Sequence, residues 1–123
     1  MHIMNKCKYC AKVDGILSKR EDYYLCWQCS NFSNNLKKYN LTIDQYRQRL
    51  EEQQFKCKIC RIPAGYTRLP GPVEKYGLVV DHCHTKNKVR GLICNRCNTV
   101  IGLCFDNPYI LTAAAHYLKN SSN

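Results

Sequence analysis

The chain has few large apolar side chains: its 123 residues include only 3 Phe, 1 Trp and 2 Met. The 45% of residues that count as hydrophobic include 10 Cys and 9 Tyr, so aliphatic bulk is also limited. A chain of this size with so little apolar bulk does not easily offset its conformational entropy by burial alone. We therefore expect cross-links that stabilise the fold.

Two kinds of targeting segment are also missing. No apolar run approaches the roughly 20 residues that a membrane-spanning helix needs. Residues 1–10 do not contain the apolar core of a signal peptide. A secreted protein stabilised by disulfides is therefore the less favoured interpretation, and we expect a cytoplasmic protein with reduced thiols and no membrane partner.

Cysteine, in contrast, is abundant. Eight of the 10 cysteines form four Cys-x-x-Cys pairs: Cys7/Cys10, Cys26/Cys29, Cys57/Cys60 and Cys94/Cys97. Two such pairs make one tetrahedral zinc site, so we predict two structural Zn²⁺ ions. We expect each site to combine neighbouring pairs, because these close the smaller loops, although pairing between the two halves of the chain is the alternative. Cys83 and Cys104 are left over and are expected to be small buried side chains.

Acidic residues are scarce, since 9 Asp and Glu stand against 19 Lys and Arg, for a net charge of +10. Eight zinc-bound thiolates would add eight negative charges and two Zn²⁺ would return four positive ones, which leaves +6. A chain that stays basic with its metals bound favours nucleic acid or another polyanion as partner. A merely soluble basic surface is the alternative.

The motifs divide the chain into three segments. Residues 1–31 form a four-Cys module with the ligand spacing of a zinc ribbon, and Asp14-Gly15 predicts a turn between two short strands. Residues 32–54 are expected to form a basic connecting helix, which begins after a capping box at Thr42. Its basic side either follows a phosphate backbone or is simply solvated. Residues 55–123 carry the chemistry.

This third segment is expected to alternate strands and helices. We predict a strand over 76–84, a turn over 85–88, a strand over 89–93, a helix over 94–103 and a last helix from Pro108 with Asp106 or Asn107 as its cap. The apolar face of the last helix is expected to pack into the core. The result is a small, zinc-stabilised α+β fold in which a strand–turn–strand–helix unit lies between two Cys-x-x-Cys pairs.

Inside this unit lies a group of side chains suited to phosphodiester hydrolysis. Asp81, His82 and His84 occupy the end of the first strand, and Asn98 directly follows the zinc ligand Cys97. A neutral imidazole is well poised to accept a proton near pH 7. Aspartate and asparagine oxygens are hard ligands suited to Mg²⁺ or Mn²⁺. We expect the hairpin to present the first three side chains against the helix that carries Asn98.

Four basic side chains lie close to this group in sequence and are candidates for DNA phosphate contacts: Lys86, Lys88, Arg90 and Arg96. One local argument opposes the proposed site. Strict strand alternation would put Asp81 and His82 on opposite faces. A bulge or strand end near the turn would reconcile them.

The histidines have a simpler interpretation, which is that His82 and His84 are extra zinc ligands or structural side chains. Eight cysteines already complete two sites, so this interpretation is disfavoured. The remaining rival is a non-catalytic zinc-finger module that binds nucleic acid. It explains the charge and the cysteines but not the combination of Asp81, both histidines and Asn98.

The stretches Asp81–His84 and Val89–Asn98 resemble the recombination endonuclease VII family, one of the His-Asn-His (HNH) or ββα-metal finger nucleases. The resemblance covers roughly residues 41–119 and includes the pair Cys57/Cys60. It implies a ββα-metal, treble-clef-like finger with flanking helices, preceded here by the zinc ribbon-like module. It also implies a phage-encoded, metal-dependent endodeoxyribonuclease, a hydrolase acting on DNA in the bacterial host cell.

The resemblance assigns roles. Asp81 and Asn98 would bind the catalytic Mg²⁺ or Mn²⁺, His82 would be the general base, and His84 would contact the scissile phosphate or support the metal. Structural zinc would be held by Cys57, Cys60, Cys94 and Cys97. The chain ends soon after Leu118 and carries the additional N-terminal module, so junction cutting by an intertwined dimer does not follow. A homing- or restriction-type nicking nuclease of the same superfamily is the alternative, with a homodimer or a protein partner allowed.

Overall fold

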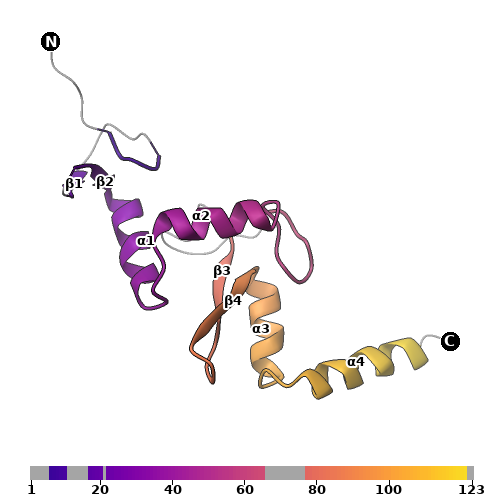
Figure 1. Ribbon diagram of the computed structural model, residues 1–123. Coiled ribbons are helices and arrows are strands. Elements are labelled where there is room, and N and C mark those ends of the chain that lie inside the picture. The colour runs from indigo at the N-terminus through magenta and orange to yellow at the C-terminus, as the bar shows by residue number, and fades with distance from the viewer. Residues whose placement is uncertain (1–5, 11–16, 21, 66–76, 122–123) are drawn as a thin grey trace, which may run out of the picture.

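The computed structural model describes residues 6–10, 17–20, 22–65 and 77–121. Within these ranges it contains four helices and two antiparallel hairpins (Figure 1). The elements follow in the order β1 (Leu17–Lys19), β2 (Tyr24–Cys26), α1 (Trp27–Lys37), α2 (Ile43–Glu52), β3 (Val79–Cys83), β4 (Lys88–Ile93), α3 (Asn95–Leu103) and α4 (Pro108–Asn120). The small α+β fold is therefore confirmed. None of these helices combines the length and apolar character needed to cross a membrane.

The first hairpin leads directly into α1. Leu17 pairs with Cys26 and Lys19 with Tyr24, and the turn is closed by the Arg20 N–H, which donates to the Tyr23 carbonyl at 2.7 Å. The turn expected at Asp14-Gly15 lies outside the described residues. Because β2 ends at the N-cap of α1, the strand pair fixes where this helix begins.

The helix expected after Thr42 is confirmed as α2. The Thr42 hydroxyl accepts from the Gln45 backbone N–H at 3.1 Å, and the Gln45 side chain accepts from the Thr42 N–H at 2.9 Å, which completes the capping box. Residues 32–37 belong to α1, so the segment 32–54 holds parts of two helices. The division of the chain into three domains stays a prediction.

The core lies between α1, α2 and the second hairpin. The rings of Phe32 and Tyr46 meet edge to face, with centroids 4.9 Å apart. The Tyr46 hydroxyl, fully buried, donates to the Leu78 carbonyl at 2.6 Å. This contact joins α2 to the chain just before β3, so α2 holds the hairpin that carries the candidate site.

A second link fixes the opposite strand. The Gln53 side chain follows α2 and binds both backbone groups of Leu92, accepting from its N–H at 2.9 Å and donating to its carbonyl at 2.8 Å. At the next residue, a Cβ added to Gly91 would lie 2.6 Å from the Lys58 Cδ. A side chain at this position would force the Lys58 side chain to move, and the Lys58 amino group donates to the Arg90 carbonyl at 3.0 Å.

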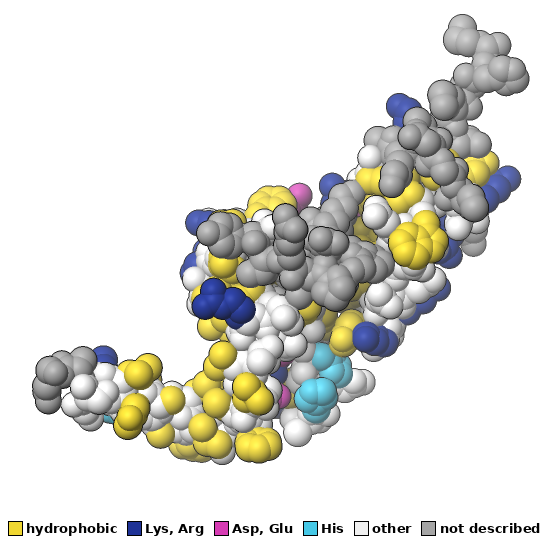
Figure 2. All heavy atoms as spheres, turned by 180° about the vertical axis from the view of Figure 1, so that it is seen from behind, with side chains coloured by type: hydrophobic (Ala, Val, Ile, Leu, Met, Phe, Trp, Pro, Cys, Tyr) yellow, Lys and Arg dark blue, Asp and Glu magenta, His cyan; other side chains and the backbone are white. Residues whose placement is uncertain are grey.

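The helices predicted after the hairpin are present as α3 and α4. Asn107 caps α4, since its side-chain oxygen accepts from the Tyr109 N–H at 2.9 Å, and Pro108 is the first helical residue, as expected. The expectation that the apolar face of α4 packs into the core is wrong. Helix α4 has no buried residue, and Tyr117 and Leu118 are 72% and 67% exposed. The turn after α3 directs α4 away from the core (Figures 1 and 2).

Candidate functional site

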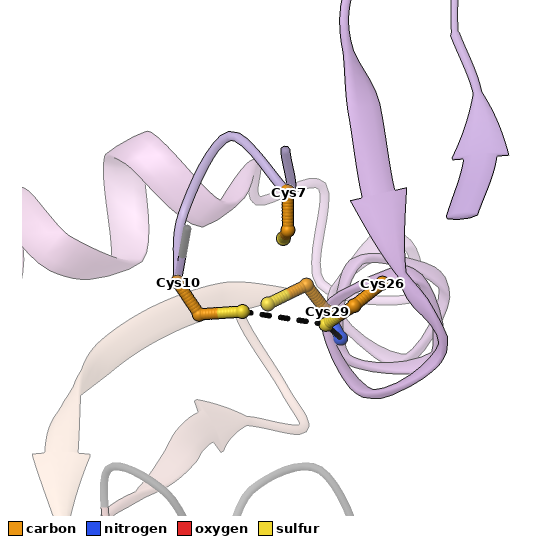
Figure 3. A group of neighbouring side chains, drawn as sticks. All are labelled: Cys7, Cys10, Cys26 and Cys29. Carbon is orange, nitrogen blue, oxygen red and sulfur yellow. Dashed lines mark hydrogen bonds between the residues drawn. The ribbon is translucent and has the colours of Figure 1, made fainter. Parts of the chain in front are cut away.

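Eight cysteines form two compact clusters, one from Cys7, Cys10, Cys26 and Cys29 and one from Cys57, Cys60, Cys94 and Cys97. In each cluster all sulfur atoms lie within 4.8 Å of one another, and the four side chains of the first point toward a common centre (Figure 3). Sulfur separations of 3.5 Å in the first cluster and 3.7 Å in the second far exceed a disulfide bond of about 2 Å. They match the edge of a zinc–thiolate tetrahedron, about 3.8 Å. The pairing of neighbouring Cys-x-x-Cys motifs is thus confirmed, and pairing between the halves is excluded.

The two clusters share one construction. The second pair of each cluster lies in the first turn of a helix, α1 or α3, where its leading cysteine is the N-cap. The Cys26 sulfur accepts from the Cys29 N–H, and the Cys94 sulfur accepts from the Cys97 N–H, both at 3.4 Å. Backbone N–H groups directed at sulfur favour the thiolate form that binds metal.

The first cysteine of each cluster shows this electrostatic effect most strongly. Burial alone would raise the pKa of Cys57, but hydrogen bonds from the backbone N–H groups of Cys94, Cys60 and Ile59 lower it to about 6. Cys7 has the same arrangement, and its pKa is also lowered to about 6. In contrast, burial and neighbouring sulfur atoms raise the pKa of Cys97. Four thiolates so close together therefore require a cation, and the soft sulfur set fits Zn²⁺.

A cavity of about 290 Å³ lies between the second hairpin and α3. Its lining residues are Tyr39, Val80, Asp81, His82, His84, Arg90, Asn98, Gly102 and Asp106. The structure thus brings together all four side chains that the sequence singled out for catalysis. Among the four candidate phosphate contacts, Arg90 lines the cavity, whereas Lys86, Lys88 and Arg96 are exposed and do not line it.

A β-bulge explains how neighbouring residues of β3 reach one cavity. Asp81 pairs with Gly91, but the next residue, His82, pairs with Val89, so Arg90 is an additional residue in β4. A bulge breaks strict alternation and increases the local twist. The conflict between Asp81 and His82 that alternation predicts is resolved by this irregularity.

The imidazole side chains of His82 and His84 both line the cavity. His82 is half-buried and His84 is exposed, with ring centroids 6.1 Å apart. The Tyr39 ring lies 5.7 Å from that of His82. Figure 2 shows histidine side chains at the surface beside acidic atoms, so a substrate backbone can approach them from solvent.

The carboxylate of Asp81 is held by Arg90. The guanidinium donates from Nε to one carboxylate oxygen at 2.7 Å and from Nη2 to the other at 2.9 Å, and Nη2 also reaches Asp106 at 3.2 Å. Hydrogen bonding to Asp81 is the main reason that the pKa of Arg90 is raised. Asp106 follows α3 in a turn where its φ is +55°, a left-handed conformation that aspartate adopts more readily than most residues other than glycine.

Asn98 is positioned by the second cysteine cluster. It directly follows Cys97, and its backbone N–H donates to the Cys94 carbonyl at 3.0 Å. Zinc bound to Cys94 and Cys97 would therefore fix the first turn of α3 and, with it, the position of the Asn98 carboxamide at the cavity. This is the local structure that the sequence spacing predicts.

Two lining residues were missed by sequence reasoning. Tyr39 comes from the turn between α1 and α2, far from the motif in sequence, and no local pattern indicates it. Asp106 was considered only as a helix cap, whereas the cap is Asn107. The available signal was an acidic residue just after the end of the helix that carries Asn98. Cys83 and Cys104, expected to be buried, are only partly so.

Comparisons with known proteins give a family and two phage relatives. A family model described as recombination endonuclease VII matches residues 32–120. The gene 59 protein of Mycobacterium phage L5 is 36% identical over 86 residues, which are 69% of this chain and 48% of that protein. The gene 59 protein of Mycobacterium phage D29 is 33% identical over 85 residues, 68% of this chain and 47% of that protein. The chain thus spans about half the length of the curated relatives it matches. No solved structure matches.

Proposed function

The chain belongs to the recombination endonuclease VII family, and from this premise we propose that it is an HNH-type, metal-dependent DNA endonuclease. The observation that carries the proposal is the single cavity lined by Asp81, His82, His84 and Asn98. In this proposal, β3, β4 and α3 form a ββα-metal finger, and the N-terminal cysteine cluster belongs to a separate zinc module.

The oxygens of Asp81 and Asn98 would hold the catalytic cation, Mg²⁺ or Mn²⁺. A carboxylate and a carboxamide are a hard donor set, and two protein oxygens leave positions for phosphate and water. When bound, the cation supplies charge that stabilises the pentavalent phosphorus and the leaving oxygen. The cysteine clusters would each hold one structural Zn²⁺.

His82 would act as the general base. Its imidazole accepts a proton from the water whose oxygen attacks phosphorus, and the P–O3′ bond breaks as the new bond forms. The leaving 3′ oxygen takes up a proton to give a 3′-hydroxyl and a 5′-phosphate. His84, exposed beside His82, would orient the scissile phosphate. Lys86, Lys88 and Arg96 would contact flanking phosphates.

Plasmid nicking tests the proposal. We expect the zinc-loaded chain to nick supercoiled DNA when Mg²⁺ or Mn²⁺ is present and not to nick it when both cations are left out of the buffer. Omission is used in place of EDTA, because EDTA binds Zn²⁺ more tightly than either cation. His82→Ala should lower the rate by about 10²–10⁴-fold while DNA binding persists. His116→Ala is the matched control, because His116 is exposed on α4 and does not line the cavity.

The outcomes separate the proposal from its rival. If the parent chain binds DNA but never cuts it with any divalent cation, the chain is a non-catalytic zinc module. If His82→Ala cuts as fast as the parent, His82 is not the base. A panel of supercoiled plasmid, linear duplex, single strand and four-way junction then identifies the DNA structure that is cut.

A further inference from the structure

We propose that Arg90 is an internal counter-ion of Asp81 that the catalytic cation must displace, and that the displaced guanidinium binds the scissile phosphate while Asp106 keeps it at the site. The inference rests on the proposed function. It starts from Arg90 as a phosphate contact, which the sequence already suggests, and adds its competition with the cation for Asp81 and the resulting order of events.

The first observation is that Arg90 binds both oxygens of the Asp81 carboxylate. Its Nε and Nη2 donate to separate oxygens at 2.7 and 2.9 Å, the fork geometry of a strong arginine–carboxylate pair. The Asp81 side chain is only 12% exposed, so this carboxylate is shielded from water and relies on the guanidinium for its charge balance. The principal candidate ligand of the cation is therefore already engaged.

A guanidinium and a divalent cation on one carboxylate repel each other. Asp81 retains lone pairs beside those used by Arg90, so simultaneous contact is sterically conceivable. The like charges would nevertheless lie only a few ångströms apart, and the interaction is unfavourable even in a site with high effective dielectric constant. Cation binding at Asp81 should therefore weaken or break the ion pair with Arg90.

Asp106 offers the displaced side chain a second position. Arg90 Nη2 already donates to Asp106 at 3.2 Å, so the guanidinium can leave Asp81 without losing all carboxylate contact. Among the described residues, Nη1 has no hydrogen-bond partner. Arg90 is 38% exposed and lines the same cavity as both histidines, so its guanidinium is accessible to a phosphate that enters this cavity.

The bulge makes this arrangement possible. Arg90 is the additional residue of β4, opposite the step from Asp81 to His82. In a regular hairpin its side chain would alternate with its neighbours and Asp81 would not share a face with His82. This one bulge thus brings together Asp81 as the candidate ligand, His82 as the candidate base and the guanidinium of Arg90 that competes with the metal ion.

The test is the affinity for Mn²⁺ in the absence of DNA, measured by isothermal titration calorimetry on zinc-loaded chains. Arg90→Gln should bind Mn²⁺ about 10-fold more tightly than the parent, because the competing charge is removed. Arg96→Gln is the matched control, since it removes an equal charge at an exposed position outside the cavity and should change the affinity far less. Asp81→Asn should weaken binding in both backgrounds.

The direction of the change in Mn²⁺ affinity distinguishes this proposal from the alternative that Arg90 only orients Asp81. If Arg90 merely orients Asp81 as a ligand, Arg90→Gln should weaken Mn²⁺ binding, by about 10–100-fold for a partner of this kind, and our inference is overturned. If Asp81→Asn leaves Mn²⁺ affinity unchanged, the cation site itself is wrong and the proposed function fails separately.

DNA affinity tests the second half of the inference. In a His82→Ala background, which blocks cleavage, Arg90→Gln should weaken DNA binding by about 10-fold when Mn²⁺ is present, since coupling of this size is typical of linked sites. Without added divalent cation the same substitution should change the DNA affinity of the zinc-loaded chain little, because Arg90 is then held by Asp81. An equal loss in both conditions would mean that Arg90 is a permanent phosphate contact and would overturn the exchange.

Discussion

Gly102 lies one helical turn beyond Asn98 on the same face of α3, and both residues line the cavity that contains Asp81 and His82. A Cβ at Gly102 would have no other atom within 4 Å, so the position is open to the cavity rather than pressed against protein. Its φ is not among the positive values of the described residues, so no backbone requirement explains the glycine. In the proposed nuclease, the missing side chain would leave room for a substrate.

Substitution of Gly102 should therefore separate stability from cleavage. Gly102→Ala should leave the fold intact and raise the free energy of unfolding by about 0.4–1 kcal/mol, because alanine restricts the unfolded chain more than glycine. Gly102→Leu should remain folded but lower the nicking rate by about 10-fold or more, because its side chain fills the space where the phosphate must be positioned. Urea unfolding and plasmid nicking measure the two effects.

Val100→Ala serves as the control on α3, because Val100 is 51% exposed and does not line the cavity. Its nicking rate should match that of the parent. If Gly102→Leu cuts DNA as fast as the parent, the cavity is not the substrate site.

The sequence predicted the parts of this fold that depend on local spacing. The Cys-x-x-Cys pairs, the capping box at Thr42 and the helix start at Pro108 each involve residues within a few positions of one another, and all three are present. The grouping of Asp81 with Asn98 followed for a related reason. The hairpin is short, and the cysteines around it fix its two ends.

The parts that were not predicted depend on tertiary contacts. The additional residue at Arg90 changes the strand register, and Gly91 beside it is a local signal too weak to show which residue is additional. Tyr39 reaches the cavity from another pair of elements. Helix α4 has the periodicity of a buried helix, but periodicity shows that an apolar face exists and not what covers it. For this reason the expected core packing of Tyr117 and Leu118 was wrong.

The hydroxyl of Tyr46 should contribute measurably to stability. It is fully buried and donates to the Leu78 carbonyl at 2.6 Å. Tyr46→Phe keeps the ring against Phe32 but leaves the carbonyl without this donor, so we expect the free energy of unfolding to fall by about 1–2 kcal/mol. Urea unfolding of zinc-saturated protein measures this loss.

Tyr9→Phe provides the matched comparison. The Tyr9 hydroxyl also donates to an oxygen, that of Asp44 at 3.2 Å, but this contact is exposed. Its removal should change the free energy of unfolding by less than about 0.5 kcal/mol. Equal effects of the two substitutions would show that Tyr46 does not anchor the chain before β3.

The two cysteine clusters should differ in what their loss does to cleavage. We expect two zinc ions per chain by elemental analysis, and either Cys10→Ser or Cys60→Ser should reduce the content to one, since a site that lacks one thiolate binds zinc far more weakly. Cys60→Ser should also abolish nicking, because the second cluster fixes the first turn of α3 and hence Asn98. Cys10→Ser should retain nicking at a temperature where circular dichroism shows it folded, because no described residue before Tyr39 lines the cavity.

If both variants keep one zinc and fold but lose nicking equally, the N-terminal cluster takes part in cleavage. The separation between an N-terminal zinc module and a nuclease finger would then be wrong.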